Sequence, residues 1–401
     1  MLCRGGIEDD GLDGVLGLRA LLLFEKQVVD TGETTHPAHL HFHFRWVTFN
    51  RVAADPAACF PDEREDVAVA TLRSRSVTTV TESTTRLGPG REVAQRMAAA
   101  FASMRDGSAD AQQVRESLRA SRKPRRHVPV ARVVDRHISG PYGAQLPVRI
   151  YQPHTGPPAP VIVYLHGGGF VLCDLDSHDA CCRRLANGVG AVVVSVDYRL
   201  APEHRFPAAL DDAWAATRWV AAHAAELGGD PGRLVLAGDS AGGNLATGVC
   251  LLARDQGGPP IAFQLLIYPV VDQRRKASAA HARSAPGVLT IDHQRWFTEQ
   301  YLGPNGDRSD VRASPILADL AGLPPAHVIT GEIDPLCDED EEYAQLLQAA
   351  GVPTTVRRYP GMFHGFFNLP DDIPIAEQAN ADACRVVREA LIGPRRPEEC
   401  R

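Results

Sequence analysis

Residues 234 to 246 read Leu-Val-Leu-Ala-Gly-Asp-Ser-Ala-Gly-Gly-Asn-Leu-Ala. The stretch begins as an apolar, strand-like run, passes through a Gly-x-Ser-x-Gly turn centred on Ser240, and continues as a helical pattern. A serine on such a sharp strand-to-helix turn requires small neighbours, because the backbone is strained and passes close to the next element. Ser240 would then lie above a sheet, at a helix N-terminus that favours negative charge on a bound molecule. The alternative is an ordinary glycine-rich turn in which Ser240 only caps the helix.

The same alternation of short apolar runs and amphipathic helical stretches extends from about Val133 to Ile392. Strands are expected at residues 147–151, 161–165, 191–197, 233–237, 263–267, 327–330 and 355–359. Helices are expected at 91–120, 177–189, 208–227, 242–254, 338–350 and 375–392. Connections long enough to hold a helix suit parallel strands, and strands that are apolar at every position suit a sheet covered on both faces. The sequence therefore predicts an α/β fold with a mostly parallel central sheet covered by helices on both faces.

A second motif, His166-Gly167-Gly168-Gly169-Phe170, directly follows one of the apolar runs. Consecutive glycines leave backbone N–H groups bare enough to approach a substrate oxygen and stabilise a tetrahedral oxyanion. We expect the donors of such an oxyanion hole to be Gly167, Gly168 and Ala241. The alternative is a flexible turn, although glycine loses much conformational entropy on folding and a plain turn rarely needs three. His166 is expected to form structural hydrogen bonds at the strand end.

Two further loops supply the residues that would activate Ser240. Asp334 follows the strand expected at 327–330, and His364 follows the strand expected at 355–359. Each residue alone has an ordinary alternative, since an aspartate there could cap the next helix and a loop histidine is often solvated. Their order after Ser240 is nevertheless that of a serine, aspartate and histidine triad on a parallel sheet. We therefore expect His364 to take and return the serine proton and Asp334 to orient the imidazole, without a metal or organic cofactor.

With these motifs, the chain from about Val133 to Ile392 resembles the hormone-sensitive-lipase-like branch of the α/β-hydrolases, which includes bacterial esterases and arylacetamide deacetylases. The matching pieces are residues 166–170, 197–203, 238–244, 334–339 and 359–366. The resemblance implies a serine carboxylesterase that hydrolyses short- to medium-chain acyl esters through an acyl-enzyme on Ser240. One alternative is a non-catalytic ligand-binding relative such as the plant gibberellin receptor, in which the catalytic histidine is replaced. The other is an amidase, a thioesterase or a lipase with the same triad.

The resemblance also implies a helical cap over the site, formed by Arg91–Ser121 and by an insertion near 272–302. The cap supplies four candidates for the acyl or alcohol pocket, which could equally be ordinary cap core: Phe101, Trp296, Phe297 and Tyr301. We accordingly divide the chain into an unassigned N-terminal extension at 1–85, a cap segment and linker at 86–132, a catalytic domain at 133–392 and a tail at 393–401.

Composition argues against several kinds of partner and compartment. The chain has 42 basic and 49 acidic residues and a formal net charge of -7, which gives no attraction for nucleic acid or anionic membranes. No stretch reaches the roughly 18 apolar residues of a membrane-spanning helix, and no signal peptide is evident. The nine cysteines include no Cys-x-x-Cys pair, which favours free thiols in a cytoplasmic protein. The expected partner is a small-molecule ester, and the oligomeric state is left open between monomer and homodimer.

One histidine cluster stands apart from these motifs. On a strand, His39, His41 and His43 would share one face, and imidazole suits zinc or copper. Because no acidic or cysteine partner is evident, we expect no metal site there and interpret the region as a poorly ordered leader.

Overall fold

The computed structural model describes residues 90–392, except 101–103, 105–108, 123–125, 155, 157 and 275–287. All of these residues belong to one structural unit, Val77–Arg401. The predicted extension at 1–85, the tail at 393–401, the cluster of His39, His41 and His43, and the pocket candidate Phe101 lie outside the described residues. The domain boundaries therefore stay predictions.

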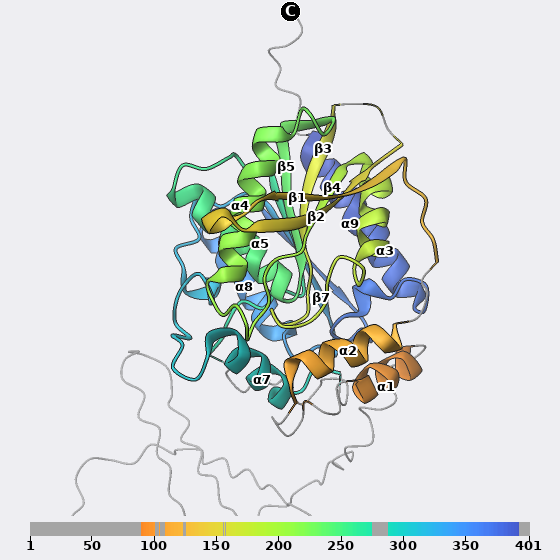
Figure 1. Cartoon of the computed structure of the whole chain (residues 1–401), viewed down its shortest axis with the longest axis vertical. Coiled ribbons are helices and arrows are strands. Elements are labelled where there is room, and N and C mark those ends of the chain that lie inside the picture. Colours follow the sequence, from red (N-terminus) through yellow and green to blue (C-terminus); the bar gives the residue numbers. More distant parts are fainter. Residues whose placement is uncertain are drawn as a thin grey trace, which may run out of the picture. The chain divides into compact units, whose positions relative to one another are not determined.

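Within the described residues, eight strands form one sheet in the order β1-β2-β4-β3-β5-β6-β7-β8 (Figure 1). The strands are β1 (Arg132–Ser139), β2 (Gln145–Gln152), β3 (Ala159–Leu165), β4 (Val192–Val196), β5 (Gly229–Asp239), β6 (Phe263–Ile267), β7 (Ala326–Gly331) and β8 (Thr354–Tyr359). The pairs β1–β2 and β2–β4 are antiparallel, and the others are parallel. The predicted mostly parallel sheet is confirmed. Strand β1 was not predicted, because only Ile138 in it is buried and its sequence forms no apolar run.

Helices cover both faces of this sheet. The helices are α1 (Arg91–Ala100), α2 (Ala111–Ser121), α3 (Asp179–Leu185), α4 (Ala208–His223), α5 (Ala241–Asp255), α7 (Ile291–Leu302), α8 (Cys337–Ala349) and α9 (Pro374–Ile392). Figure 1 shows α4, α5 and α8 on one side of the strands and α3 and α9 on the other. Central strand β3 serves both layers, because Val161 and Val163 pack into the core beneath α4 and α5 while Ile162 packs with α3 and α9. A strand buried on both faces explains the unbroken apolar run.

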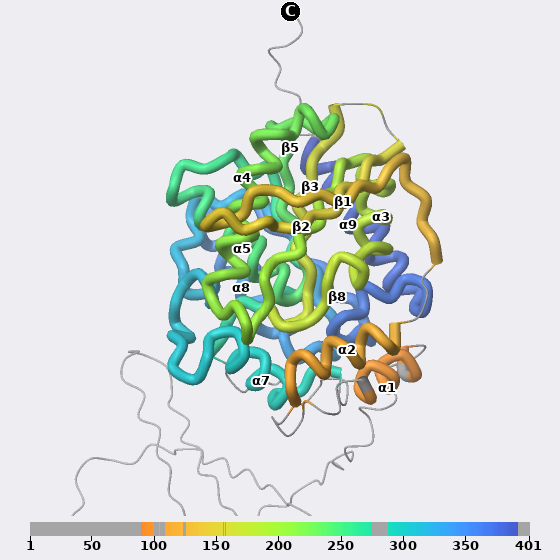
Figure 2. The backbone as a smooth tube through the Cα atoms, viewed as in Figure 1, coloured from red at the N-terminus to blue at the C-terminus, as the bar shows by residue number. Residues whose placement is uncertain are grey.

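Three helices lie together beyond one end of the sheet. Figures 1 and 2 show α1, α2 and α7 at that end, residues of all three line one cavity, and they correspond to the predicted helical cap. Helix α2 turns Ala111 and Val114 inward, and the side chain of its N-cap residue Asp110 accepts the Gln113 N–H. Helix α7 begins with a capping box, in which Thr290 and His293 each satisfy a backbone amide of the other. These caps fix where the two cap helices begin.

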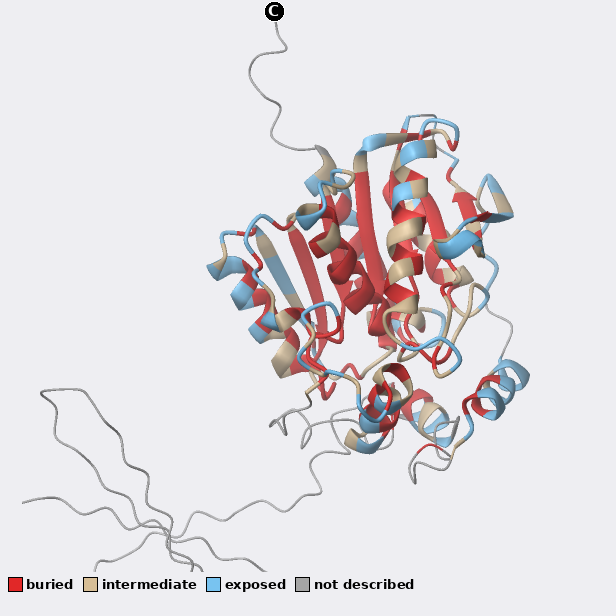
Figure 3. Ribbon diagram, turned by 60° about the vertical axis from the view of Figure 1, so that its left-hand side comes forward, coloured by how far each residue is buried: buried red, intermediate tan, exposed pale blue. Residues whose placement is uncertain are grey.

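Burial follows the layers of the fold. Figure 3 shows the central strands buried along most of their length, whereas the helices have exposed outer faces. Both edge strands are more exposed than the central ones: only Ile138 is buried in β1, and Val356 in β8 is 39% exposed. Among the helices of the described residues, none combines the length and apolar character that crossing a membrane requires.

Candidate active site

Ser240 occupies the tight connection between β5 and α5. Its backbone has φ 55° and ψ -117°, a conformation that costs a non-glycine residue energy and is typical of functional turns. The connection is held from β6, because the Ser240 N–H donates to the Ile267 carbonyl at 2.8 Å and the Val270 N–H donates to the Ser240 carbonyl at 3.1 Å. A side chain at Gly242 would overlap the carbonyl oxygen of Leu165, so this position in the first turn of α5 must be glycine. The strained serine is therefore held by the two neighbouring strands.

The three residues of the predicted triad lie in hydrogen-bond contact, although 124 residues separate Ser240 from His364. Ser240 Oγ lies 2.9 Å from His364 Nε2, and His364 Nδ1 lies 2.7 Å from Asp334 Oδ2. Asp334 is completely buried, and its other oxygen accepts the Leu336 N–H at 2.9 Å. A carboxylate facing Nδ1 favours the proton on that nitrogen and leaves Nε2 free to accept the serine proton.

Backbone hydrogen bonds tie the loop that carries Asp334 to the loop that carries His364. The Ile333 N–H donates to the Met362 carbonyl at 2.9 Å, and the Gly361 N–H donates to the Glu332 carboxylate at 2.8 Å. These bonds fix the distance between the two triad residues independently of their own contact.

Tyr268 is a buried neighbour of the triad that the sequence analysis missed. Its ring centroid lies 4.8 Å from that of His364, and the side chain is fully buried. The residue directly follows β6, and its position at the carboxyl end of a predicted strand could have marked it as a site residue.

The glycine loop departs from the prediction at one position. The Gly167 N–H donates to Asp239 Oδ1 at 3.0 Å and is not free to bind a substrate oxygen, so its assignment as an oxyanion donor was wrong. Gly168 and Gly169 have φ values of 111° and 63°, which favour glycine, and both line the cavity beside Ser240. Among the described residues, neither amide donates a hydrogen bond. Gly169 was not predicted, although it belongs to the same motif. Ala241 is the first residue of α5, where amides have no intrahelical partner.

His166 lies beside this loop but not in the triad. It is fully buried, its ring stacks on Tyr198 with centroids 4.3 Å apart, and its Nδ1 lies 2.8 Å from the Gly167 carbonyl oxygen. Burial and the neighbouring His178 lower the pKa of His166 to about 4, so its ring is neutral at pH 7. These contacts agree with the structural role expected from the sequence.

Comparison with known proteins places this geometry in a family. A family model described as the alpha/beta hydrolase fold matches residues 162–368. The chain belongs to this α/β-hydrolase family. Esterase LipI of Mycobacterium tuberculosis is 46% identical over 292 residues, which cover 70% of this chain and 88% of that protein. Carboxylesterase NlhH of the same species is 44% identical over 283 residues, which cover 69% and 88%.

Solved structures give the same result. The structure of a hyperthermophilic esterase from the archaeon Pyrobaculum calidifontis matches with a TM-score of 0.70 and 42% sequence identity, covering 76% of this chain and 98% of that one. Fold and sequence thus agree, and the family predicted from the sequence motifs is confirmed.

The hydrolase has a cavity of about 320 Å³ that opens onto Ser240 and His364. Apolar side chains dominate its wall: Met97, Leu118, Phe170, Leu172, Val270, Val288, Leu289, Phe297, Leu336 and Leu369. Polar groups of the cap form another part: Gln273, His293, Gln294 and Thr298. Charged and polar side chains from outside the insertion line it as well: Arg115, Arg119, Arg122, Asp174, Asp176, Ser177, His178, Asp239 and Asn368. A largely apolar wall with polar groups at fixed points is the usual form of a small-molecule site.

Only one of the described pocket candidates lines this cavity. Phe297 does so, and its ring packs against Gly169 so closely that a side chain there would overlap it. Tyr301 is fully buried and stacks on Phe170 at a centroid distance of 3.6 Å, while Trp296 is 3% exposed and packs edge-on against Phe297. Trp296 and Tyr301 are therefore cap core, and their assignment to the pocket is corrected.

No group of three or more potential metal ligands of the His, Cys, Asp or Glu type gathers in the part of the chain that the structure describes.

Gly242→Ala should destabilise the hydrolase by about 3 kcal/mol or more and abolish its activity, because the added methyl group meets the backbone of β3 rather than a yielding side chain. Urea unfolding followed by circular dichroism measures the change. Gly156→Ala is the matched control, since a methyl group there enters open space and should leave the midpoint unchanged. A wild-type midpoint for Gly242→Ala would contradict the close packing.

Proposed function

We propose that the protein hydrolyses carboxylic esters through an acyl-enzyme on Ser240, with His364 as general base and acid and Asp334 as the residue that orients it. The observation that carries the proposal is the continuous hydrogen-bonded line from Ser240 through His364 to buried Asp334, beside an apolar cavity. Ester hydrolysis is also the activity that the names of the relatives at 44% and 46% identity share.

The reaction follows from the proton inventory of these residues. As Ser240 Oγ attacks the ester carbonyl carbon, His364 Nε2 accepts the hydroxyl proton, and Asp334 stabilises the resulting imidazolium. The tetrahedral intermediate collapses when His364 donates that proton to the leaving alkoxide, which departs as the alcohol. Water then attacks the acyl-enzyme, His364 accepts a proton from the water, and its return to Ser240 Oγ releases the carboxylic acid.

We assign stabilisation of the tetrahedral oxyanion to the backbone amides of Gly168, Gly169 and Ala241. Support comes from the cavity-lining position of the two glycines and from the place of Ala241 at the N-terminus of α5. Helix N-termini favour negative charge, and preorganised donors act on the charge that develops in the transition state.

Two observations favour this proposal over two of its alternatives, a non-catalytic relative and a long-chain lipase. A non-catalytic ligand-binding relative would be expected to have lost its base, whereas His364 is present and lies 2.9 Å from Ser240 Oγ. A lipase for long-chain esters would need more room, since about 320 Å³ is near the lower end of the roughly 300–1,000 Å³ range of ligand sites. A small ester of short to medium acyl length is the substrate that fits.

Ser240→Ala should lower the rate of p-nitrophenyl butyrate hydrolysis by about 10⁴-fold or more, and His364→Ala should behave similarly, because the nucleophile and its base act as a unit. Asp334→Asn should retain measurable activity, since the oxyanion donors remain. Spectrophotometric assays together with labelling by a fluorophosphonate probe report the outcome. Ser309→Ala, at an exposed loop position, is the control. Wild-type-like turnover by Ser240→Ala would sink the assignment.

The size of the cavity predicts a limit on acyl length. Across p-nitrophenyl esters from acetate to palmitate, kcat/KM should be highest for short to medium chains and at least about tenfold lower for palmitate. Phe297→Ala should shift the preference towards longer chains because it removes a ring from the cavity wall. Tyr142→Ala removes an aromatic side chain that is 96% exposed and should leave the profile unchanged. A palmitate optimum in the wild type would refute the size limit but not the serine chemistry.

We also propose that the protein works in a reducing compartment such as the cytoplasm. Each of the six cysteines in the described part of the chain is a free thiol, and five of them are buried. Oxidising compartments favour disulfides instead. Cell fractionation should recover the protein with cytoplasmic enzymes, and recovery from the medium would argue against this compartment.

A further inference from the structure

Asp239, the residue before Ser240, is a buried carboxylate at the back of the active site. It is 3% exposed, and four groups contact its two oxygens: Gly167 N and Tyr164 OH at Oδ1 (3.0 and 2.8 Å), and His178 Nε2 and Asn368 Nδ2 at Oδ2 (3.2 and 2.9 Å). Burial alone would raise the pKa of Asp239, but His178, through its charge and hydrogen bond, and the Tyr164 hydroxyl lower it to about 2. The ester hydrolysis derived above uses none of these four contacts.

The Gly167 contact connects Asp239 to the oxyanion donors. Gly167 begins the glycine loop, and the next two residues carry the amides assigned to the oxyanion. A side chain at Gly167 would overlap the Asp239 carboxylate, so the loop and the carboxylate fit closely. Because a misplacement of about 1 Å can cost roughly 10²-fold in rate, the position of the Asp239 carboxylate decides how well the loop works.

His178 is a second buried partner of that carboxylate. Its side chain is 5% exposed, and Nε2 faces the carboxylate as a donor because a carboxylate can only accept. The other ring nitrogen lies 2.9 Å from Ser177 Oγ, which sets the orientation of the imidazole. Asn368, on the loop that follows His364, donates to the same carboxylate oxygen. Two donors from different elements therefore converge on one oxygen of Asp239.

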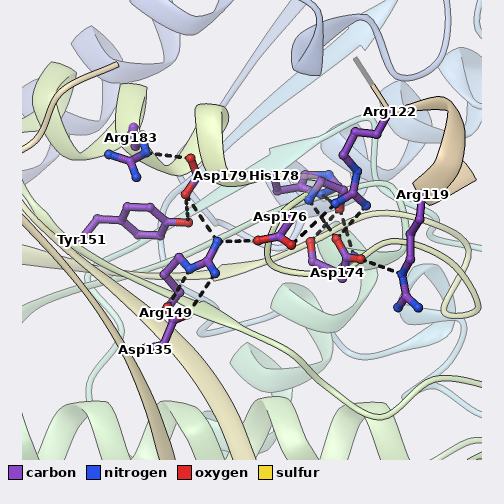
Figure 4. A network of polar contacts seen from close by, with 11 residues as sticks. Arg119, Arg122, Asp135, Arg149, Tyr151, Asp174, Asp176, His178, Asp179 and Arg183 are labelled. Atoms are coloured by element: carbon purple, nitrogen blue, oxygen red, sulfur yellow. Dashed lines mark hydrogen bonds and ion pairs between the residues drawn. The ribbon is translucent and has the colours of Figure 1, made fainter. Parts of the chain in front are cut away.

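Cap helix α2 binds the turn that carries His178. Asp174 accepts the Ser177 N–H at 2.9 Å through Oδ1, and its own carbonyl accepts the Ser177 hydroxyl at 2.6 Å. The carboxylate of Asp174 also receives Arg119 Nε at 3.2 Å and Arg122 Nη2 at 2.8 Å. Figure 4 shows both arginines reaching from α2 and its end to Asp174, with His178 next to this turn.

A third arginine of the same helix holds the start of this segment. Arg115 donates to the carbonyl of Val171 at 2.7 Å and to that of Ala201 at 2.6 Å, and it forms an ion pair with Glu203. Val171 is two residues beyond Gly169. Helix α2 therefore binds both ends of the segment that runs from the glycine loop to His178.

We propose that His178 is a positioning residue that holds the Asp239 carboxylate against the Gly167 amide. Through this contact the position of cap helix α2 affects the position of the oxyanion-binding glycines. The proposal rests on the esterase function proposed above. His178 acts through Asp239 and transfers no proton to or from the substrate.

The test compares His178→Leu, which removes the donor, with His178→Gln, which keeps an N–H donor. His178→Leu should lower kcat for p-nitrophenyl butyrate by about 10²-fold with KM changed less than about threefold, because donor placement acts on the transition state. The kcat of His178→Gln should be at least about tenfold higher than that of His178→Leu. The matched control is His154→Leu, at an exposed position shortly before β3 begins. Ser240 lies at the other end of the sheet, where the parallel strands β3 and β5 end, so this variant should match the wild type.

Hydrogen exchange gives a measurement that does not depend on activity. In His178→Leu, a peptide covering residues 166–173 should exchange faster than in the wild type, whereas His178→Gln should stay close to the wild type. A wild type without esterase activity would refute the proposed function, and the exchange comparison would still decide the positioning role. Unchanged kcat or unchanged exchange in a folded His178→Leu would overturn the positioning role, as would a His178→Gln variant that folds but rescues nothing.

A second variant covers the case in which His178→Leu does not fold. The double variant Arg119→Gln/Arg122→Gln changes partly exposed side chains and should lower kcat by about five- to tenfold with faster exchange of the same peptide. Combined with His178→Leu, its effect should be less than additive, since both act on one network. Full kcat and wild-type exchange in the double variant would overturn the link to the cap.

Discussion

The close approach of α5 to the end of β3 is the constraint on which the site depends. Gly242 lies against the Leu165 carbonyl, and the connection from β5 to α5 has no room there for a side chain. Ser240, two residues earlier in the same tight connection, has a positive φ of 55°. The glycine loop begins one residue after His166, which itself follows Leu165, so the same contact brings the oxyanion donors beside the nucleophile. One backbone contact thus places two parts of the machinery that are far apart in sequence.

Two buried carboxylates near Ser240 receive different partners. Asp334 faces the imidazole of His364 and one backbone amide, so it acts on the base. Asp239 faces a backbone amide of the glycine loop and three side chains, so it acts on the donors. A third buried carboxyl, Asp340, has no hydrogen-bond partner for its oxygens among the described residues. Burial and the nearby Asp334 raise the pKa of Asp340 well above its usual range.

Much of this arrangement could be predicted from sequence because it depends on local pattern and chain order. Unbroken apolar runs predicted the central strands, and each reactive residue follows a predicted strand. The errors concern tertiary contacts. The Gly167 amide is occupied by a side chain 72 residues away, which no local pattern encodes. Trp296 and Phe297 are neighbours on α7, and only the packed cap determines which of them faces the cavity. The edge strand β1 lacks an apolar pattern because both of its faces are largely exposed.

The cap does more in this structure than close a cavity. The ion pairs of Arg119 and Arg122 with Asp174 involve partly exposed cations, and such pairs contribute at most about 1 kcal/mol each. Arg115 is different, because its side chain is only 10% exposed and donates to two backbone carbonyls besides Glu203. Hydrogen bonds from a buried guanidinium are stronger and more directional. Arg115 therefore fixes the position of α2, and Arg119 and Arg122 bind the turn that carries His178. Since oxyanion donors act only if they are in place before the reaction, a cap joined to their loop is part of the catalytic structure rather than a cover.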